Sequence, residues 1–173
     1  ASRGAGGGAS ADYVIWRAGL NLQQILPYDF SMRFTANAQT TRNALVAGEQ
    51  FGVGGANSVR GFNERVYSND KGHQASIELY TPELANKIHF EGGRLRFLVF
   101  YDTASLSRNF IQAGEQTGLG IDSVGIGVRM TYRERFSMRL DYAQVLHDGG
   151  MDAGLPNGRR NSNTLHAAAL LVY

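Results

Sequence analysis

The sequence predicts an all-β protein, specifically an antiparallel transmembrane β-barrel with eight strands in these 173 residues. Its 22 glycines, 9 phenylalanines and 8 tyrosines accompany only 3 prolines, which suits strands joined by glycine-bearing loops. Long segments alternate between apolar and polar residues, a period typical of strands with one apolar face. No run of about 18 apolar residues occurs, so the sequence contains no candidate for a membrane-spanning helix.

Four strands are expected in the first half of the chain. Residues 12–24 and 30–40 alternate most regularly, with apolar side chains at even positions. Residues 46–53 alternate less regularly, and residues 73–81 carry their apolar side chains at odd positions. The segment 26–29 contains a proline and an aspartate, which indicates a tight turn between the first two strands.

Four more strands are expected in the second half. Residues 94–103 and 164–173 are apolar at odd positions, and residues 122–133 and the strand that begins at Phe136 are apolar at even positions. Expected lengths of about nine to twelve residues match the tilted strands that cross a bilayer. We therefore expect the apolar faces to contact lipid.

The opposite faces of these strands carry charges. Six arginines and three acidic residues fall there: Arg17, Arg33, Arg94, Arg96, Arg129 and Arg139, with Glu78, Asp102 and Asp141. Burying so many ions in a dry core costs several kcal/mol for each unpaired charge. A water-filled lumen is the expected surrounding.

The connections between the expected strands differ in length. Those at 54–72, 104–121 and 147–163 are long and rich in glycine, asparagine and aspartate, and they are expected to share the extracellular side. With eight strands, both chain ends then lie on the periplasmic side, and the turn at 26–29 lies on the extracellular side. Residues 1–11 are glycine-rich and are expected to be a linker or the remnant of a loop.

Several functions are not supported by the composition. A net charge of +2 without a basic run gives no nucleic-acid footprint, and the lack of cysteine excludes disulfides and thiolate metal sites. The 4 histidines lack the spacing of metal ligands, so no metal or other cofactor is expected. Ser123 lies in an alternating strand rather than in a strand-to-helix turn, so we expect no catalytic residue and no enzyme activity.

One segment, GGANSVRGFNER at 54–65, has the composition of a shaped loop. Its glycines at 54, 55 and 61 permit backbone angles and close approaches that a side chain prevents. The single arginine between small residues, Arg60, is followed at once by a glycine and an aromatic ring. This arrangement suggests that another part of the protein receives the arginine.

Four stretches together resemble a known family: GEQFGVGGANSVRGF (48–62), HQASIELYTPEL (73–84), LRFLVFYDTA (95–104) and a last strand that ends in an aromatic residue. They are similar to the C-terminal half of the barrel in two-partner secretion transporters, the haemolysin-activation and filamentous-haemagglutinin secretion proteins. These belong to the superfamily of the BamA barrel-assembly protein. The loop motif of that superfamily matches Val59, Arg60, Gly61 and Phe62, and its strand motif matches Phe100 to Asp102.

The resemblance implies that loop 54–72 folds back into the lumen, where Arg60 meets Asp102 on the wall. Glu78 and Asp141 also face inward and are alternative acceptors. Leu171 and Tyr173 then form the C-terminal assembly signal, although phenylalanine is usual in the last position. Residues 12–173 are expected to be the C-terminal part of a sixteen-stranded barrel.

The resemblance also implies a location and partners. The place is the bacterial outer membrane, and the partners are outer-membrane lipid, a secreted cargo protein and the barrel-assembly machinery. We expect both edges of the sheet to pair with the missing half of the barrel or with another chain, because unpaired edges are unfavourable in lipid. No POTRA domain is recognisable in these residues.

Three functions stay open on the sequence. The first is an outer-membrane pore component that translocates a haemolysin- or adhesin-type cargo. The second is a BamA-like assembly or surface-display barrel, which the number of upstream POTRA domains would distinguish. The third is a self-closed eight-stranded outer-membrane adhesin or ligand-binding barrel, because eight strands enclose an interior just wide enough for side chains.

Overall fold

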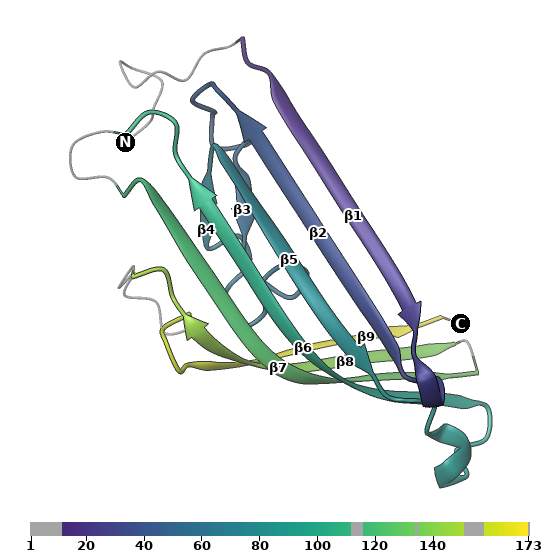
Figure 1. Cartoon of the computed structure of the whole chain (residues 1–173). Helices are drawn as coiled ribbons and strands as arrows, with labels where there is room; N and C mark the ends of the chain where they lie inside the picture. The colour runs from purple at the N-terminus through teal and green to yellow at the C-terminus, as the bar shows by residue number, and fades with distance from the viewer. Residues whose placement is uncertain (1–11, 112–115, 134, 151–157, 173) are drawn as a thin grey trace.

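The computed structural model describes residues 12–111, 116–133, 135–150 and 158–172 of the chain. Seven strands form one antiparallel sheet in the order β1-β2-β5-β6-β7-β8-β9 (Figure 1). They are β1 (Ile15–Ile25), β2 (Ser31–Thr41), β5 (Lys71–Tyr80), β6 (Gly93–Ser107), β7 (Gly118–Tyr132), β8 (Phe136–His147) and β9 (Asn163–Leu171). The prediction of an antiparallel, all-β architecture is confirmed.

Two short 3-10 helices lie outside the sheet. Helix η1 (Pro27–Asp29) forms the turn between β1 and β2, and η2 (Ala85–Ile88) lies between β5 and β6. No helix among the described residues combines the length and the apolar character needed to span a membrane.

The alternation seen in the sequence becomes two chemically different faces. Large apolar side chains are exposed on the outer face, as at Val99 (51% exposed), Ile126 (60%) and Leu165 (65%). Their strand neighbours turn to the inner face, where Asp102 and Asp141 are completely buried. Successive side chains of a strand point to opposite faces, so a regular register places each set on one side. The β7–β8 register shifts once, between Asp122 and Ser123.

The sequence prediction for residues 46–53 was wrong in its placement. Within this segment only β3 (Phe51–Val53) is a strand, and it pairs with β4 (Tyr67–Asn69) in a separate two-stranded ribbon. The described sheet therefore has seven strands where eight were expected. The physical reason is that the segment belongs to the connection between β2 and β5, whose ends are held together locally, as where Leu45 N–H donates to Asp70 Oδ1 at 2.8 Å.

Because residues 46–53 do not form a strand of the wall, every element before them lies at the opposite end of the sheet from the end expected. The turn at 26–30 lies at the same end of the sheet as the β5–β6 and β7–β8 connections and the end of β9 (Figure 1). The start of β1 lies at the other end, together with the ends of the strands that the β2–β5, β6–β7 and β8–β9 connections join. The expected sides of the 26–29 turn and of the start of the first strand were therefore wrong, whereas the end of β9 lies opposite the long connections, as expected.

The sheet curls around the β2–β5 loop, residues 42–70, which packs on the concave inner face (Figure 1). Strands β1 and β9 are the two edges of the described sheet and do not pair with each other. The fold thus corresponds to part of a barrel wall with a loop on its inner side.

Candidate functional site

The segment 54–65 of the β2–β5 loop adopts the tight shape that its glycines predict. Gly54, Gly55 and Gly61 have φ angles of 105°, 102° and 102°, which side chains rarely adopt. At Gly61 a Cβ would also lie 3.0 Å from Val145 Cγ2 on β8. The loop backbone can therefore approach the wall closely only because residue 61 has no side chain.

Two side chains of segment 54–65 pack into an apolar area of the inner face. Val59 and Phe62 are completely buried, and they join a cluster with inner residues of β6, β7 and β8. The wall residues of this cluster are Ala104, Leu106, Ile121 and Val145. The water-filled surrounding expected for the inner face is thus wrong for these positions on β6, β7 and β8, because the loop covers them and removes them from water.

Between Val59 and Gly61 lies Arg60, whose side chain is only 4% exposed. Its Nε donates to Asp102 Oδ2 and its Nη2 to Asp102 Oδ1, both at 2.7 Å, which is a bidentate pair. Its backbone N–H also donates to Asp102 Oδ2, at 3.1 Å. The structure brings together the loop arginine and the wall carboxylate, which are 42 residues apart in the sequence.

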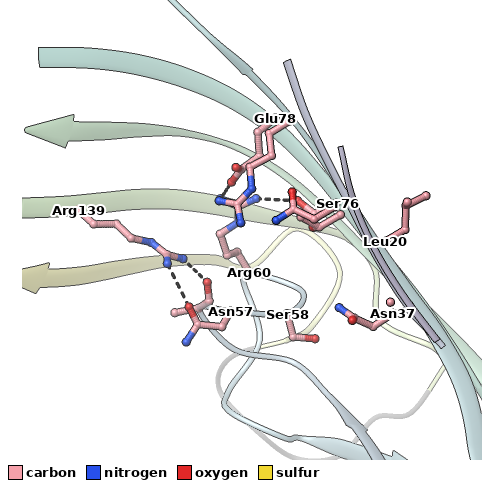
Figure 2. A pocket seen from close by; sticks show the side chains of 13 residues that line it. Leu20, Asn37, Asn57, Ser58, Arg60, Ser76, Glu78 and Arg139 are labelled. Carbon is pink, nitrogen blue, oxygen red and sulfur yellow. Dashed lines mark hydrogen bonds and ion pairs between the residues drawn. The ribbon is translucent and has the colours of Figure 1, made fainter. Parts of the chain in front are cut away.

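Further groups complete the surroundings of Arg60. Nη1 donates to Glu78 Oε1 at 2.8 Å, and Nη2 donates to Ser76 Oγ at 3.1 Å (Figure 2). The guanidinium carbon lies 3.4 Å from the centre of the Phe100 ring. Burial alone lowers the pKa of Arg60, but the hydrogen bond and charge of Asp102, with the charges of Glu78 and Asp141, raise it above its ordinary value. The guanidinium is therefore held in its charged form.

Asp141 is the third inner carboxylate, and two other arginines lie closer to it than Arg60 does. Arg129 Nη1 and Arg139 Nε lie 2.8 and 2.7 Å from its oxygens, whereas Arg60 Nη1 lies 3.7 Å away. Together with Glu78 and Asp102, the site holds three carboxylates against three arginines. We call these six residues the arginine–carboxylate cluster. Its balance matters because an unpaired ion at such a depth would be costly.

The loop is held at two further points that the sequence did not indicate. Arg139 on β8 donates to the backbone carbonyl of Ala56 and to Asn57 Oδ1, the latter at 3.1 Å (Figure 2). On β9, Thr164 Oγ1 donates to the carbonyl of Gly61 at 2.9 Å, and His166 Nε2 accepts from the Gly61 N–H at 3.4 Å. These contacts depend on how the loop folds across strands, for which the alternating pattern carries no signal.

The remaining expected residues lie away from the cluster. Leu171 is the last residue of β9 and is 67% exposed, whereas Tyr173 lies outside the described residues, as do residues 1–11. Ser123 is buried in β7. Among the other inward arginines, Arg17 pairs with Glu49 at 3.1 Å and Arg96 with Glu83 at 3.8 Å.

An antiparallel sheet with an apolar outer face, and with a loop fixed to charged residues of its inner face, has the features of an outer-membrane β-barrel wall. Residues 1–130 match the family of the haemolysin secretion/activation proteins ShlB/FhaC/HecB. The chain belongs to this family of two-partner secretion transporters, which are outer-membrane proteins and not enzymes. Searches among curated proteins and among solved structures gave no match.

Proposed function

We propose that this chain forms part of an outer-membrane pore that translocates a secreted protein in two-partner secretion. The family supports this function, and the apolar outer face, with Val99, Ile126 and Leu165 exposed, supports a location in the bacterial outer membrane. The cargo is of the haemolysin or adhesin type. Outer-membrane lipid is the second partner, and the barrel-assembly machinery that inserts the strands is the third.

The single observation that carries the proposal is the buried contact of Arg60 with Asp102 and Glu78. We assign residues 54–70 of the β2–β5 loop to the lumen, with the motif Val59 to Phe62 as the anchor of the loop and with Phe100 and Asp102 as its receptor on the wall. Glu78 is the second acceptor, and Asp141 contributes at longer range. Removing one partner of a buried pair costs about 3 to 5 kcal/mol, so the anchor keeps the loop in a defined place while cargo passes.

Edges β1 and β9 support the further proposal that additional strands complete the barrel. Backbone groups along an unpaired edge have no water to bind within a membrane, where each unsatisfied group costs several kcal/mol. We infer that both edges pair with strands outside residues 12–173. We also assign Leu171 and Tyr173, at the end of β9, to the signal that the assembly machinery reads.

The function is tested by measuring cargo in the culture medium of cells that carry the full-length transporter. Arg60→Ala is expected to lower secretion strongly while the barrel still inserts, as judged by its heat-modifiable mobility in detergent gels. Arg65→Ala is the matched control, because Arg65 lies in the same loop but is exposed. Its Nη2 donates a long hydrogen bond, 3.3 Å, to the backbone carbonyl of Gln50.

Two results would contradict the proposal. Equal secretion by the Arg60→Ala variant and the parent protein would remove the role of the anchor. Deletion of the transporter that spares cargo secretion but lowers the amounts of other outer-membrane proteins would assign the chain to barrel assembly instead.

A further inference from the structure

The inner face of the sheet falls into two halves that differ in access to solvent. On β6, β7 and β8 the loop covers it, and Asp102, Ile121, Ser123 and Val145 are at most 1% exposed. On β1 and β2 most inward side chains between the strand ends stay exposed or half-exposed. We call the first the covered half and the second the open half.

The open half borders a hollow of about 510 Å³ between the strands and the tip of the β2–β5 loop. Asn21, Arg33 and Asn37 line it from β1 and β2, and Asn57 and Ser58 line it from the loop. Figure 2 shows Asn37 on the strand side and Asn57 and Ser58 on the loop side. We call these five residues the polar track.

The chemistry of the polar track matches a polypeptide backbone without selecting one sequence. Each asparagine amide carries two N–H donors and a carbonyl acceptor, which are the complementary partners of peptide carbonyl and N–H groups. The Asn57 side-chain oxygen already accepts from Arg139, so Asn57 contributes mainly its N–H donors. Strands β1 and β2 are antiparallel neighbours, with Asn21 opposite Thr35 and Asn37 opposite Gln74 of β5, so the amides are spaced along an extended direction. An extended segment lying along the strands can therefore meet them in succession.

The charge of the track gives it a preference. Arg33 makes no hydrogen bond or ion pair with any residue in the described ranges, although it lines the hollow. The acidic residue opposite Arg33 in the register, Glu78, is already engaged by Arg60 and by the Tyr80 hydroxyl. Near the loop end of the strands, Glu49 is paired with Arg17. The track thus presents uncompensated positive charge, which attracts acidic side chains and repels basic ones.

We propose that the polar track binds an extended polypeptide segment with neutral or acidic side chains, and that the covered half stays closed while the segment passes. This inference rests on the proposed secretion function and assigns the contact surface of the cargo to β1 and β2. Arg33 is its specificity-determining residue. The arginine–carboxylate cluster holds the loop so that the track remains open beside it.

The charge preference is tested with full-length transporter in planar lipid bilayers, using poly-L-glutamate and poly-L-lysine of equal length as probes. Poly-L-glutamate is expected to block the ion current at lower concentration than poly-L-lysine. Arg33→Gln should raise the half-blocking concentration of poly-L-glutamate by about two- to fivefold, the effect of losing one partly exposed ion pair. Arg42→Gln is the matched control, because Arg42 is exposed one residue beyond the end of β2.

The division of the inner face is tested with single thiols, since the chain contains no cysteine. A charged methanethiosulfonate reagent is expected to react with Asn37→Cys and lower the current, and to leave Ser123→Cys unmodified. Equal reaction at both positions, or equal block of the Arg33→Gln variant and the parent protein, would overturn the proposal. Neither of these measurements uses the cargo protein. If poly-L-glutamate blocks the Arg33→Gln variant and the parent protein equally, only the proposal for the polar track is refuted. If the Arg60→Ala variant secretes cargo normally, the proposed function is refuted.

Discussion

The open and covered halves of the inner face begin from the same sequence pattern and end in different surroundings. Both have alternating strands, and in both the outward side chains are apolar and exposed, as at Leu22 (54%) and Ile126 (60%). The inward side chains of β1 remain in solvent, whereas Asp102 and Asp141 are completely buried. The difference comes from one loop, which contacts β6, β7 and β8 closely and leaves most of β1 and β2 uncovered. Alternation therefore determines which way a side chain points, and the loop determines whether water reaches it.

The largest expected difference between the halves concerns charge. Asp102→Ala leaves the buried Arg60 without its bidentate partner and is expected to lower the free energy of unfolding by about 3 to 5 kcal/mol. Asn37→Ala, in the open half, is expected to change it by less than about 0.5 kcal/mol. Urea titrations of the full-length transporter refolded in lipid vesicles measure both. Equal effects of the two variants would contradict the comparison.

Loss of an apolar contact between the loop and the covered half should lower the free energy of unfolding nearly as much as loss of the Asp102 carboxylate. Phe62 is completely buried against the covered half, so Phe62→Ala is expected to cost about 3 kcal/mol or more. The same substitution should expose the inner wall, so that a thiol placed at Ser123 becomes reactive. A Phe62→Ala variant in which this thiol stays unreactive would show that the loop does not cover the wall in the membrane.

On the outer face, an introduced charge should have the same cost behind the open half as behind the covered half. Phe34→Arg on β2 and Ile126→Arg on β7 each place a charge on the apolar side, and each is expected to cost about 2 to 4 kcal/mol near the bilayer midplane. Refolding titrations in vesicles measure the two costs. A neutral result at either position would mean that this face does not contact lipid, and a large difference between them would extend the comparison to the outer face.

The smallest expected effect is that of a methyl group. Gly61→Ala forces a side chain onto a backbone with φ 102° beside Val145 and should cost about 1 to 3 kcal/mol. Gly19→Ala on β1 places its Cβ 3.1 Å from the flexible Asn37 side chain and at an ordinary 4.0 Å from the Ala36 carbonyl oxygen, and it should change stability by less than about 0.5 kcal/mol. The midpoint of urea unfolding compares the two variants, and a larger shift for Gly19→Ala would contradict the assignment of close approach to residue 61.

Local features of the sequence determined much of this protein. The period of two gave the strands and their two faces, because neighbouring side chains of a strand alternate in direction whatever the rest of the chain does. The glycines around Arg60 indicated a shaped loop for the same kind of reason, since they act on their own backbone angles. The motifs around Arg60 and Asp102 carried the family resemblance, which the family match confirms.

Only the tertiary structure decided where segments with weak local signals belong. Residues 51–53 are strand-like, but they pair within the β2–β5 loop rather than in the wall, and this reversed the expected side of the first turn. The contacts of Arg139 with Ala56 and Asn57 join residues more than 80 positions apart, and those of Thr164 and His166 with Gly61 span more than 100. Such contacts depend on loop closure and on packing between distant segments, neither of which a period within one strand encodes.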